Sequence, residues 1–103
     1  MVDLHIPVKG IYFDQIKAGT KPREYRLVTD YWITRLSGRE YRNVVLTRGY
    51  PKGGGIEGKT RLTLPYRGYE RTAITHPHFG PHEVAVFAID VSPPTNEGRF
   101  DHD

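Results

Sequence analysis

The chain has 103 residues, of which 37% are hydrophobic and 26% are charged, with a net charge of +3 and no cysteine. This composition excludes a disordered chain, a disulfide scaffold and a thiolate metal site, and the length allows one small domain. No apolar run can span a bilayer and residues 1–8 lack a signal-peptide core, so we expect a cytoplasmic protein with no membrane partner.

Charge is distributed unevenly along the chain. Residues 17–71 carry thirteen Lys or Arg against five Asp or Glu, whereas the two ends together carry two against seven. A basic middle between acidic ends indicates a one-sided field that attracts phosphates. The alternative is that these charges are spread over the surface and only keep the protein soluble.

The first elements are a strand and a helix. Alternating apolar residues predict a strand over residues 4–8, placed at a sheet edge because Pro7 cannot donate to a ladder. A helix is predicted over about residues 11–18, with Gly19 in the position of a left-handed cap. Residues 24–28 then predict a second strand.

The middle of the chain predicts a second helix and a buried strand. Thr29 or Asp30 is a suitable N-cap for a short helix that ends at Gly38. Residues 41–47 contain a Val-Val-Leu run, which is typical of a buried strand. The glycine-rich residues 49–55 predict a loop.

Two further strands are predicted in the second half. Residues 61–65 alternate like a strand, and Pro65 ends that strand or confines it to an edge. The proline- and histidine-rich residues 75–82 predict a loop. Residues 84–91 are apolar on both faces, which indicates a central strand that is covered on each side.

Strands therefore dominate the predicted order, which favours a mainly β member of the α+β class. We expect a small, closed or nearly closed β-barrel of about five to six strands with two or more short flanking helices. One domain is expected over residues 1–92, followed by a flexible acidic tail over residues 93–103. The oligomeric state is left open.

One apparent nucleotide motif fails its structural context. Residues 53–60 match the phosphate-loop pattern G-x-x-x-x-G-K-[ST]. That pattern binds phosphate only where a buried strand precedes the loop and a helix follows it, and residues 61–65 alternate like a strand instead. We therefore reject a nucleotide hydrolase.

A histidine cluster suggests metal binding but has irregular spacing. His76, His78, His82 and Glu83 fit no standard zinc arrangement, and prolines interrupt them. We predict exposed loop histidines instead, and no metal or other cofactor.

The best candidate site follows the first helix, over residues 19–26. Strand alternation puts Glu24 and Arg26 on one face and Tyr25 on the other, with Lys21 just before them. A cation, a carboxylate and a guanidinium that converge there indicate a polar or anion-binding pocket. The alternative is a structural ion pair.

Tyrosines alternate with cations through the basic middle of the chain. Such pairs stack single-stranded bases and neutralise phosphates, which favours RNA over duplex DNA. The alternative is that the tyrosines simply pack a β-rich core. The expected ligand-binding residues are Lys21, Glu24, Tyr25, Arg26, Arg48 and Tyr50.

These residues give the sequence a family likeness: it resembles the ASCH domain family, a branch of the PUA-like superfamily. The family hallmark G-x-K-x-x-E-x-R is complete here as Gly19, Lys21, Glu24 and Arg26. The predicted strands and the first helix fall in the expected order over about residues 3–91. The resemblance implies a β-barrel with helices closing one end, a cleft lined by the motif, and RNA-related roles.

The resemblance also implies catalysis in some branches. One branch is similar to amidohydrolases that deacylate acetylated cytidine with a lysine, a threonine nucleophile and a downstream glutamate. Glu24 stands where that branch has its threonine, and a carboxylate does not replace a hydroxyl nucleophile. Another branch resembles metal-independent ribonucleases, in which Lys21 with Tyr50 or Tyr25 would act.

Three functions are consistent with these patterns. The first is an RNA- or nucleotide-binding module in which Lys21 and Arg26 contact phosphate, and Glu24 accepts from a base or orients Arg26. The second is a small RNA-directed enzyme, a ribonuclease or an amidohydrolase on a modified nucleoside, with Lys21 and Glu24 catalytic. The third is an interaction subunit in which the motif is purely structural.

Overall fold

The computed structural model describes residues 2–93, so the predicted tail over residues 93–103 lies outside the described part except for Pro93. The helices and strands follow one another as β1 (Leu4–Val8), α1 (Gly10–Ala18), β2 (Arg23–Leu27), α2 (Asp30–Leu36), β3 (Asn43–Arg48), β4 (Arg61–Pro65), β5 (Tyr69–Ile74) and β6 (Val84–Asp90). Two short 3-10 helices, η1 (Lys52–Gly54) and η2 (Pro77–Phe79), lie within the predicted loops.

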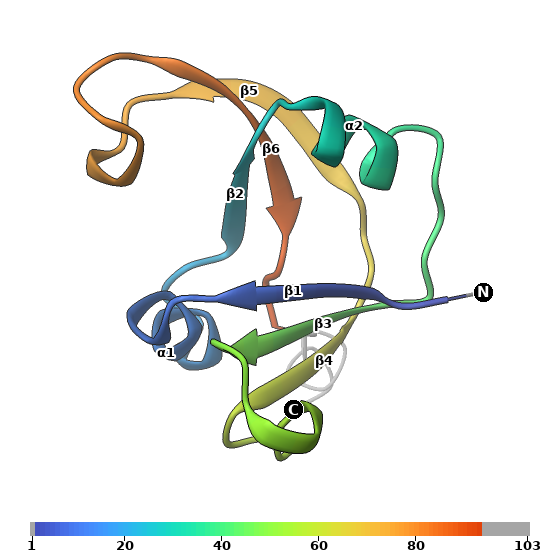
Figure 1. Cartoon of the computed structure of the whole chain (residues 1–103). Helices are drawn as coiled ribbons and strands as arrows, with labels where there is room; N and C mark the ends of the chain where they lie inside the picture. Colours follow the sequence, from blue (N-terminus) through green and yellow to red (C-terminus); the bar gives the residue numbers. More distant parts are fainter. Residues whose placement is uncertain (1, 94–103) are drawn as a thin grey trace, which may run out of the picture.

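The six strands form two three-stranded sheets (Figure 1). The first has the order β1-β3-β4, with β1 parallel to β3 and β4 antiparallel to it. The second has the order β2-β6-β5 and is antiparallel throughout. The strands of one sheet run across those of the other, and α1 and α2 flank the pair (Figure 1). The mainly β, mixed α+β class is confirmed.

The expected closed barrel is not formed. No ladder among the described residues joins one sheet to the other. Pro65 ends β4 and cannot donate to a ladder, and Gly68, with a φ of 86°, turns the chain towards β5 in the second sheet. The two sheets therefore pack face to face instead of continuing into one closed surface.

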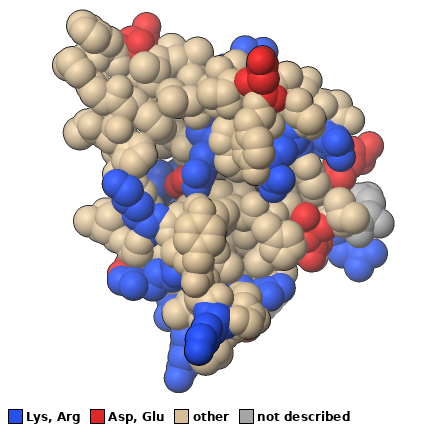
Figure 2. Space-filling view, viewed as in Figure 1, with Lys and Arg blue, Asp and Glu red and all other residues tan. Residues whose placement is uncertain are grey.

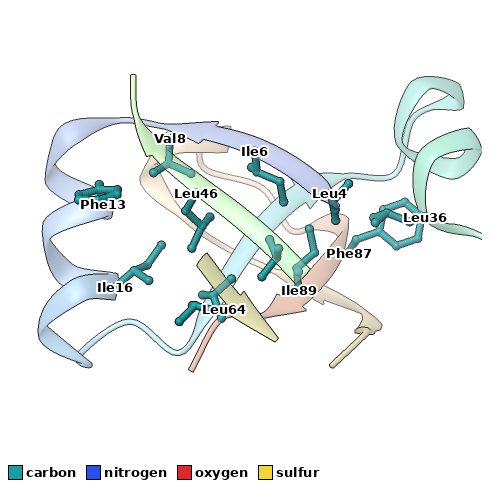
Figure 3. Close-up of a cluster of buried hydrophobic side chains, with 12 residues drawn as sticks. Leu4, Ile6, Val8, Phe13, Ile16, Leu36, Leu46, Leu64, Phe87 and Ile89 are labelled. Atoms are coloured by element: carbon teal, nitrogen blue, oxygen red, sulfur yellow. The ribbon is translucent and has the colours of Figure 1, made fainter. Parts of the chain in front are cut away.

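A single apolar core lies between the two sheets and the helices (Figure 3). Phe87 and Ile89 of β6 meet Leu4 and Ile6 of β1 there, and all four are fully or almost fully buried. At about 25 cal/mol per Å² of apolar surface removed from water, this burial is the main term that stabilises the fold. The packed core fixes the position of β2, the strand that carries the candidate site.

Strand positions agree well with the sequence, with one omission. β1 and β4 are edge strands, as their prolines predicted, and β6 is central with four consecutive buried residues. The strand β5 was not predicted. Its residues are exposed or half-buried and carry no apolar alternation, so its formation depends on pairing with β6.

Candidate functional site

The G-x-K-x-x-E-x-R segment connects α1 to β2. Gly19 adopts the left-handed conformation, with a φ of 83°, and its N–H donates to the carbonyl of Ile16 at 3.0 Å. The N–H groups of Thr20 and Lys21 both donate to the carbonyl of Gln15, at 3.0 and 3.2 Å. This turn ends the helix and delivers Lys21 to the start of the strand.

Glu24 is buried, with a relative exposure of 5%, and lies between two cations. Its Oε2 is 2.9 Å from Nη2 of Arg26, and its Oε1 is 3.6 Å from Nζ of Lys21. Both cations are also held by backbone oxygens. Lys21 donates to the carbonyl of Arg23 at 2.7 Å, and Arg26 donates to the carbonyl of Pro7 at 2.8 Å.

A pocket of about 280 Å³ opens beside these three charged residues. Four segments far apart in the sequence form its walls: the end of β1, α1, the β3–β4 connection and the loop that contains η2. Figure 2 shows this face of the molecule hollowed, with basic side chains beside the hollow. The residues that line the pocket are Pro7, Val8, Lys9, Tyr12, Lys21, Glu24, Tyr25, Arg26, Gly49, Tyr50, His76, His78 and Phe79.

Aromatic side chains surround the ammonium of Lys21. Its Nζ lies 4.6 Å from the ring centroid of Tyr25 and 5.3 Å from that of Tyr12. Both distances are within the range of a cation–π interaction. Tyr25 was expected on the opposite face from Glu24, yet both residues line the same pocket, at β2, which is an edge strand of its sheet.

The η2 loop adds an aromatic cluster to the pocket wall. The ring of Tyr12 makes edge-on contacts with His76 and His78, with centroids 6.0 and 5.9 Å apart. His78 in turn lies edge-on to Phe79 at 5.0 Å. His78 and His82 are exposed, as predicted, whereas His76 is half-buried; His76 and His78 both line the pocket.

His78 is favoured in its neutral form. Desolvation by burial lowers the pKa of His78 below its usual value of 6.5, and the nearby charge of Lys9 lowers it further, with Glu24 opposing both. Its backbone N–H donates to Nδ1 of His76 at 3.0 Å, so that nitrogen of His76 is an acceptor. The pocket thus offers fixed cations together with uncharged aromatic rings.

Arg26 is supported from behind by the one tryptophan of the chain. The guanidinium carbon of Arg26 lies 5.3 Å from the Trp32 ring, and that of Arg35 lies 5.4 Å from the same ring. Trp32 is placed by the start of α2, where its N–H donates to the hydroxyl of the N-cap Thr29 at 3.3 Å. A change at Arg26 should therefore alter the fluorescence of Trp32.

Five of the six sequence-predicted site residues line the pocket: Lys21, Glu24, Tyr25, Arg26 and Tyr50. The sixth, Arg48, does not. Its Nε and Nη2 each lie 3.2 Å from a carboxylate oxygen of Asp14 on α1. That hydrogen-bonded pair raises the pKa of Arg48 and lowers the pKa of Asp14.

Eight residues that line the pocket were not predicted from the sequence, and four of them carry aromatic rings: Tyr12, His76, His78 and Phe79. On α1 only Phe13 and Ile16 are buried, and Tyr12 is half-buried where it lines the pocket. The η2 residues lie more than fifty positions after the motif, and no local pattern connects them to it. The one local signal in the sequence is the position of Tyr12 directly before the buried Phe13, which places Tyr12 at the border of the buried face of α1.

The phosphate-loop match is not followed by a helix. Residues 53–60 begin within η1, continue through turns with left-handed glycines and lead directly into β4, which confirms the rejection of that motif. Within residues 2–93, no group of three or more histidines or carboxylates is arranged to hold a metal ion. In the same part of the chain, no helix has both the length and the apolar character needed to cross a bilayer.

Comparison with protein-family models, with curated proteins and with solved structures finds no match to this chain. Function is therefore inferred from the geometry of the pocket.

Proposed function

We propose that the chain is an RNA- or nucleotide-binding module that holds its ligand in the pocket beside β2. The observation that carries this proposal is the position of Lys21 and Arg26 on either side of the buried Glu24, within a pocket lined by aromatic rings. Two cations share one carboxylate, so the motif as a whole is positively charged. The aromatic rings add flat apolar surfaces that suit a base.

The chemistry of the pocket fits one nucleotide unit. Lys21 and Arg26 supply positive charge and charge-assisted donors for a phosphate. Tyr12, Tyr25 and His78 supply stacking or edge contacts for the base. Ligand pockets usually measure about 300–1,000 Å³, so this volume of about 280 Å³ favours a single nucleotide over a larger ligand.

We further propose that the module belongs to the ASCH branch of the PUA-like superfamily. The complete motif Gly19, Lys21, Glu24 and Arg26 supports this assignment, together with the β-rich order of six strands. The two packed sheets would correspond to an open form of the barrel that the family resemblance implies. In this pocket, Glu24 would orient Arg26 or accept a hydrogen bond from the amino group of a base.

Binding of a fluorescent single-stranded RNA at low ionic strength tests the proposal. Lys21→Gln and Arg26→Gln should each weaken binding about tenfold or more, because a hydrogen bond to a charged group contributes about 1.5 kcal/mol or more. Arg39→Gln is the matched control, since Arg39 is exposed and lies outside the pocket. Equal affinities for all four proteins would contradict a binding role for the motif.

A second candidate function is catalysis on RNA or on a modified nucleoside. The gathering of Lys21, Glu24 and a neutral His78 in one pocket favours it, because titratable groups cluster in active sites. Incubation with RNA and with acylated cytidines should then yield products that Lys21→Ala abolishes. Identical product profiles from the wild type and this variant would remove the catalytic function and leave binding untouched.

A further inference from the structure

The hairpin between β3 and β4 carries two lysines whose charge is not neutralised by the rest of the described chain. Lys52 and Lys59 are exposed, and neither belongs to an ion pair within residues 2–93. The one acid of the hairpin, Glu57, is engaged elsewhere. It pairs with Arg61 at 3.5 Å and accepts hydrogen bonds from the N–H and hydroxyl of Thr63, both at 2.8 Å.

This hairpin begins at the wall of the pocket. The N–H of Gly49 donates to the carbonyl of Val8 at 2.8 Å, and Val8 lines the pocket. Tyr50 follows at the pocket rim with a relative exposure of 90%, so its ring is almost fully open to solvent. Lys52 comes two residues later, and its Cα therefore lies at most about 7.6 Å from that of Tyr50.

Internal contacts give the hairpin a defined shape. The N–H of Ile56 donates to the hydroxyl of Thr60 at 2.9 Å, and the N–H of Gly58 donates to the carbonyl of Arg61 at 2.8 Å. A Cβ at Gly55 would meet that same hydroxyl at 3.0 Å, so glycine permits the close approach. In Figure 2, basic side chains gather at the lower tip of the molecule, where the β3–β4 connection lies in Figure 1.

We infer that the ligand of the pocket is a single-stranded nucleic acid, whose backbone leaves the pocket over Tyr50 and continues along Lys52 and Lys59. This inference rests on the proposed function. An exposed tyrosine beside uncompensated cations is the arrangement that binds successive bases and phosphates of a single strand. The glycines that imitate a phosphate loop thus hold two phosphate-binding lysines on a turn.

The test compares a ribonucleoside monophosphate with short oligonucleotides of RNA and of single-stranded DNA. The variant is Lys52→Gln/Lys59→Gln, and the matched control is Lys17→Gln/Arg39→Gln, which removes two exposed cations away from the pocket and the hairpin. Each phosphate that a cation neutralises on a single strand adds about 0.7 to the magnitude of the slope of log affinity against log salt. The slope of the hairpin variant should therefore be smaller in magnitude by about 1.4. Its affinity for the monophosphate should equal that of the wild type.

The outcomes separate this inference from the proposed function. If the hairpin variant keeps the wild-type salt slope and oligonucleotide affinity while the monophosphate still binds, the strand path is overturned and the pocket remains. If neither the monophosphate nor any oligonucleotide binds, both are overturned. A difference between the RNA and DNA arms identifies which single strand the surface takes.

Discussion

Glu24 sets the charge balance of the pocket at the scale of single residues. It is the one charged residue of the described chain that is buried, and both of its oxygens face cations. Without this carboxylate, the like charges of Lys21 and Arg26 would repel each other in a partly buried environment that screens charge poorly. The residue therefore holds two phosphate-binding groups close together, whatever ligand they meet.

Glu24→Gln should lower the free energy of unfolding by about 1.5–3 kcal/mol, the range for hydrogen bonds that involve charged groups. The amide keeps the shape of the side chain but removes the negative charge that both cations require. Urea unfolding of the variant measures the loss, with Glu40→Gln as the control because Glu40 is exposed. An unchanged midpoint would show that the ion pairs contribute nothing to stability.

His78 should make binding depend on pH. In the free protein, desolvation and the charge of Lys9 lower the pKa of His78. An anion bound in the pocket would favour the charged imidazolium and raise that pKa, so binding would take up a proton. Affinity for an oligonucleotide without terminal phosphates should thus rise as the pH falls through 6.5 and below. His78→Gln should flatten this profile, whereas His82→Gln, which alters an exposed histidine outside the pocket, should leave it unchanged.

Residues close in sequence were predictable and distant pairs were not. The Lys21–Glu24–Arg26 group follows from strand spacing alone, and it forms as expected. The sequence predicts Arg48 at the ligand, but Asp14, thirty-four positions earlier, pairs with it instead. The side-chain partner of an exposed arginine depends on how helix and sheet pack, which spacing in the sequence does not encode.

The junction between α1 and β2 is the element on which the site depends. Gly19 ends the helix in the left-handed conformation, and the carbonyl of Pro22 accepts a hydrogen bond from the N–H of Val91 at 3.0 Å. The turn is thereby fixed at both ends, to the helix and to the residue that follows β6. The cap was predicted from the sequence because only glycine adopts that conformation at low cost.

Gly19→Ala should destabilise the protein by about 1–2 kcal/mol, the cost of a left-handed conformation for a residue with a Cβ. The added methyl group meets only Pro93, at 3.8 Å, so the cost is conformational and not a clash. Thermal unfolding measures it, with Gln15→Ala on the exposed face of α1 as the control. Equal melting temperatures for the two variants would contradict the cap.

A second network of hydrogen bonds and ion pairs is centred on Asp90, the last residue of β6. Asp90 accepts hydrogen bonds from the N–H and hydroxyl of Ser92, at 3.0 and 2.6 Å, and pairs with Arg67 and Arg23. Although burial opposes the charged form, the bonds from Ser92 and the pairing with Arg67 lower the pKa of Asp90 to about 2. The network ties β2 and the β4–β5 connection to β6.

This network predicts an acid-dependent contribution to stability. A carboxyl whose pKa is lower in the folded state stabilises the fold above its usual value of 3.8 and loses that effect as the pH falls through about 2. The difference in melting temperature between the wild type and Asp90→Asn should therefore be largest near neutral pH. It should shrink as the pH is lowered from about 4 to about 2, and a constant difference would contradict the network.

At the scale of the whole molecule, the sequence predicted the apolar core better than it predicted how the two sheets are joined. The apolar residues of two crossed sheets and both helices form one core, which the alternation of the sequence largely predicted. The prediction of a closed or nearly closed barrel was wrong, because closure depends on how far strand pairing continues past Pro65 and Gly68. The loop that contains η2 completes the pocket, and its position is set by its attachment to β5 and β6. Nothing in its own sequence predicts that position.

The pocket as the ligand site is the central claim, and an NMR titration with ribonucleoside monophosphates at low salt tests it most directly. Backbone amide shifts should concentrate in β2, around Tyr12 of α1 and in η2, and the Trp32 indole should shift through its contact with Arg26. Lys21→Gln should reduce these shifts together. Shifts that are absent, or that fall on residues outside the pocket, would contradict the claim.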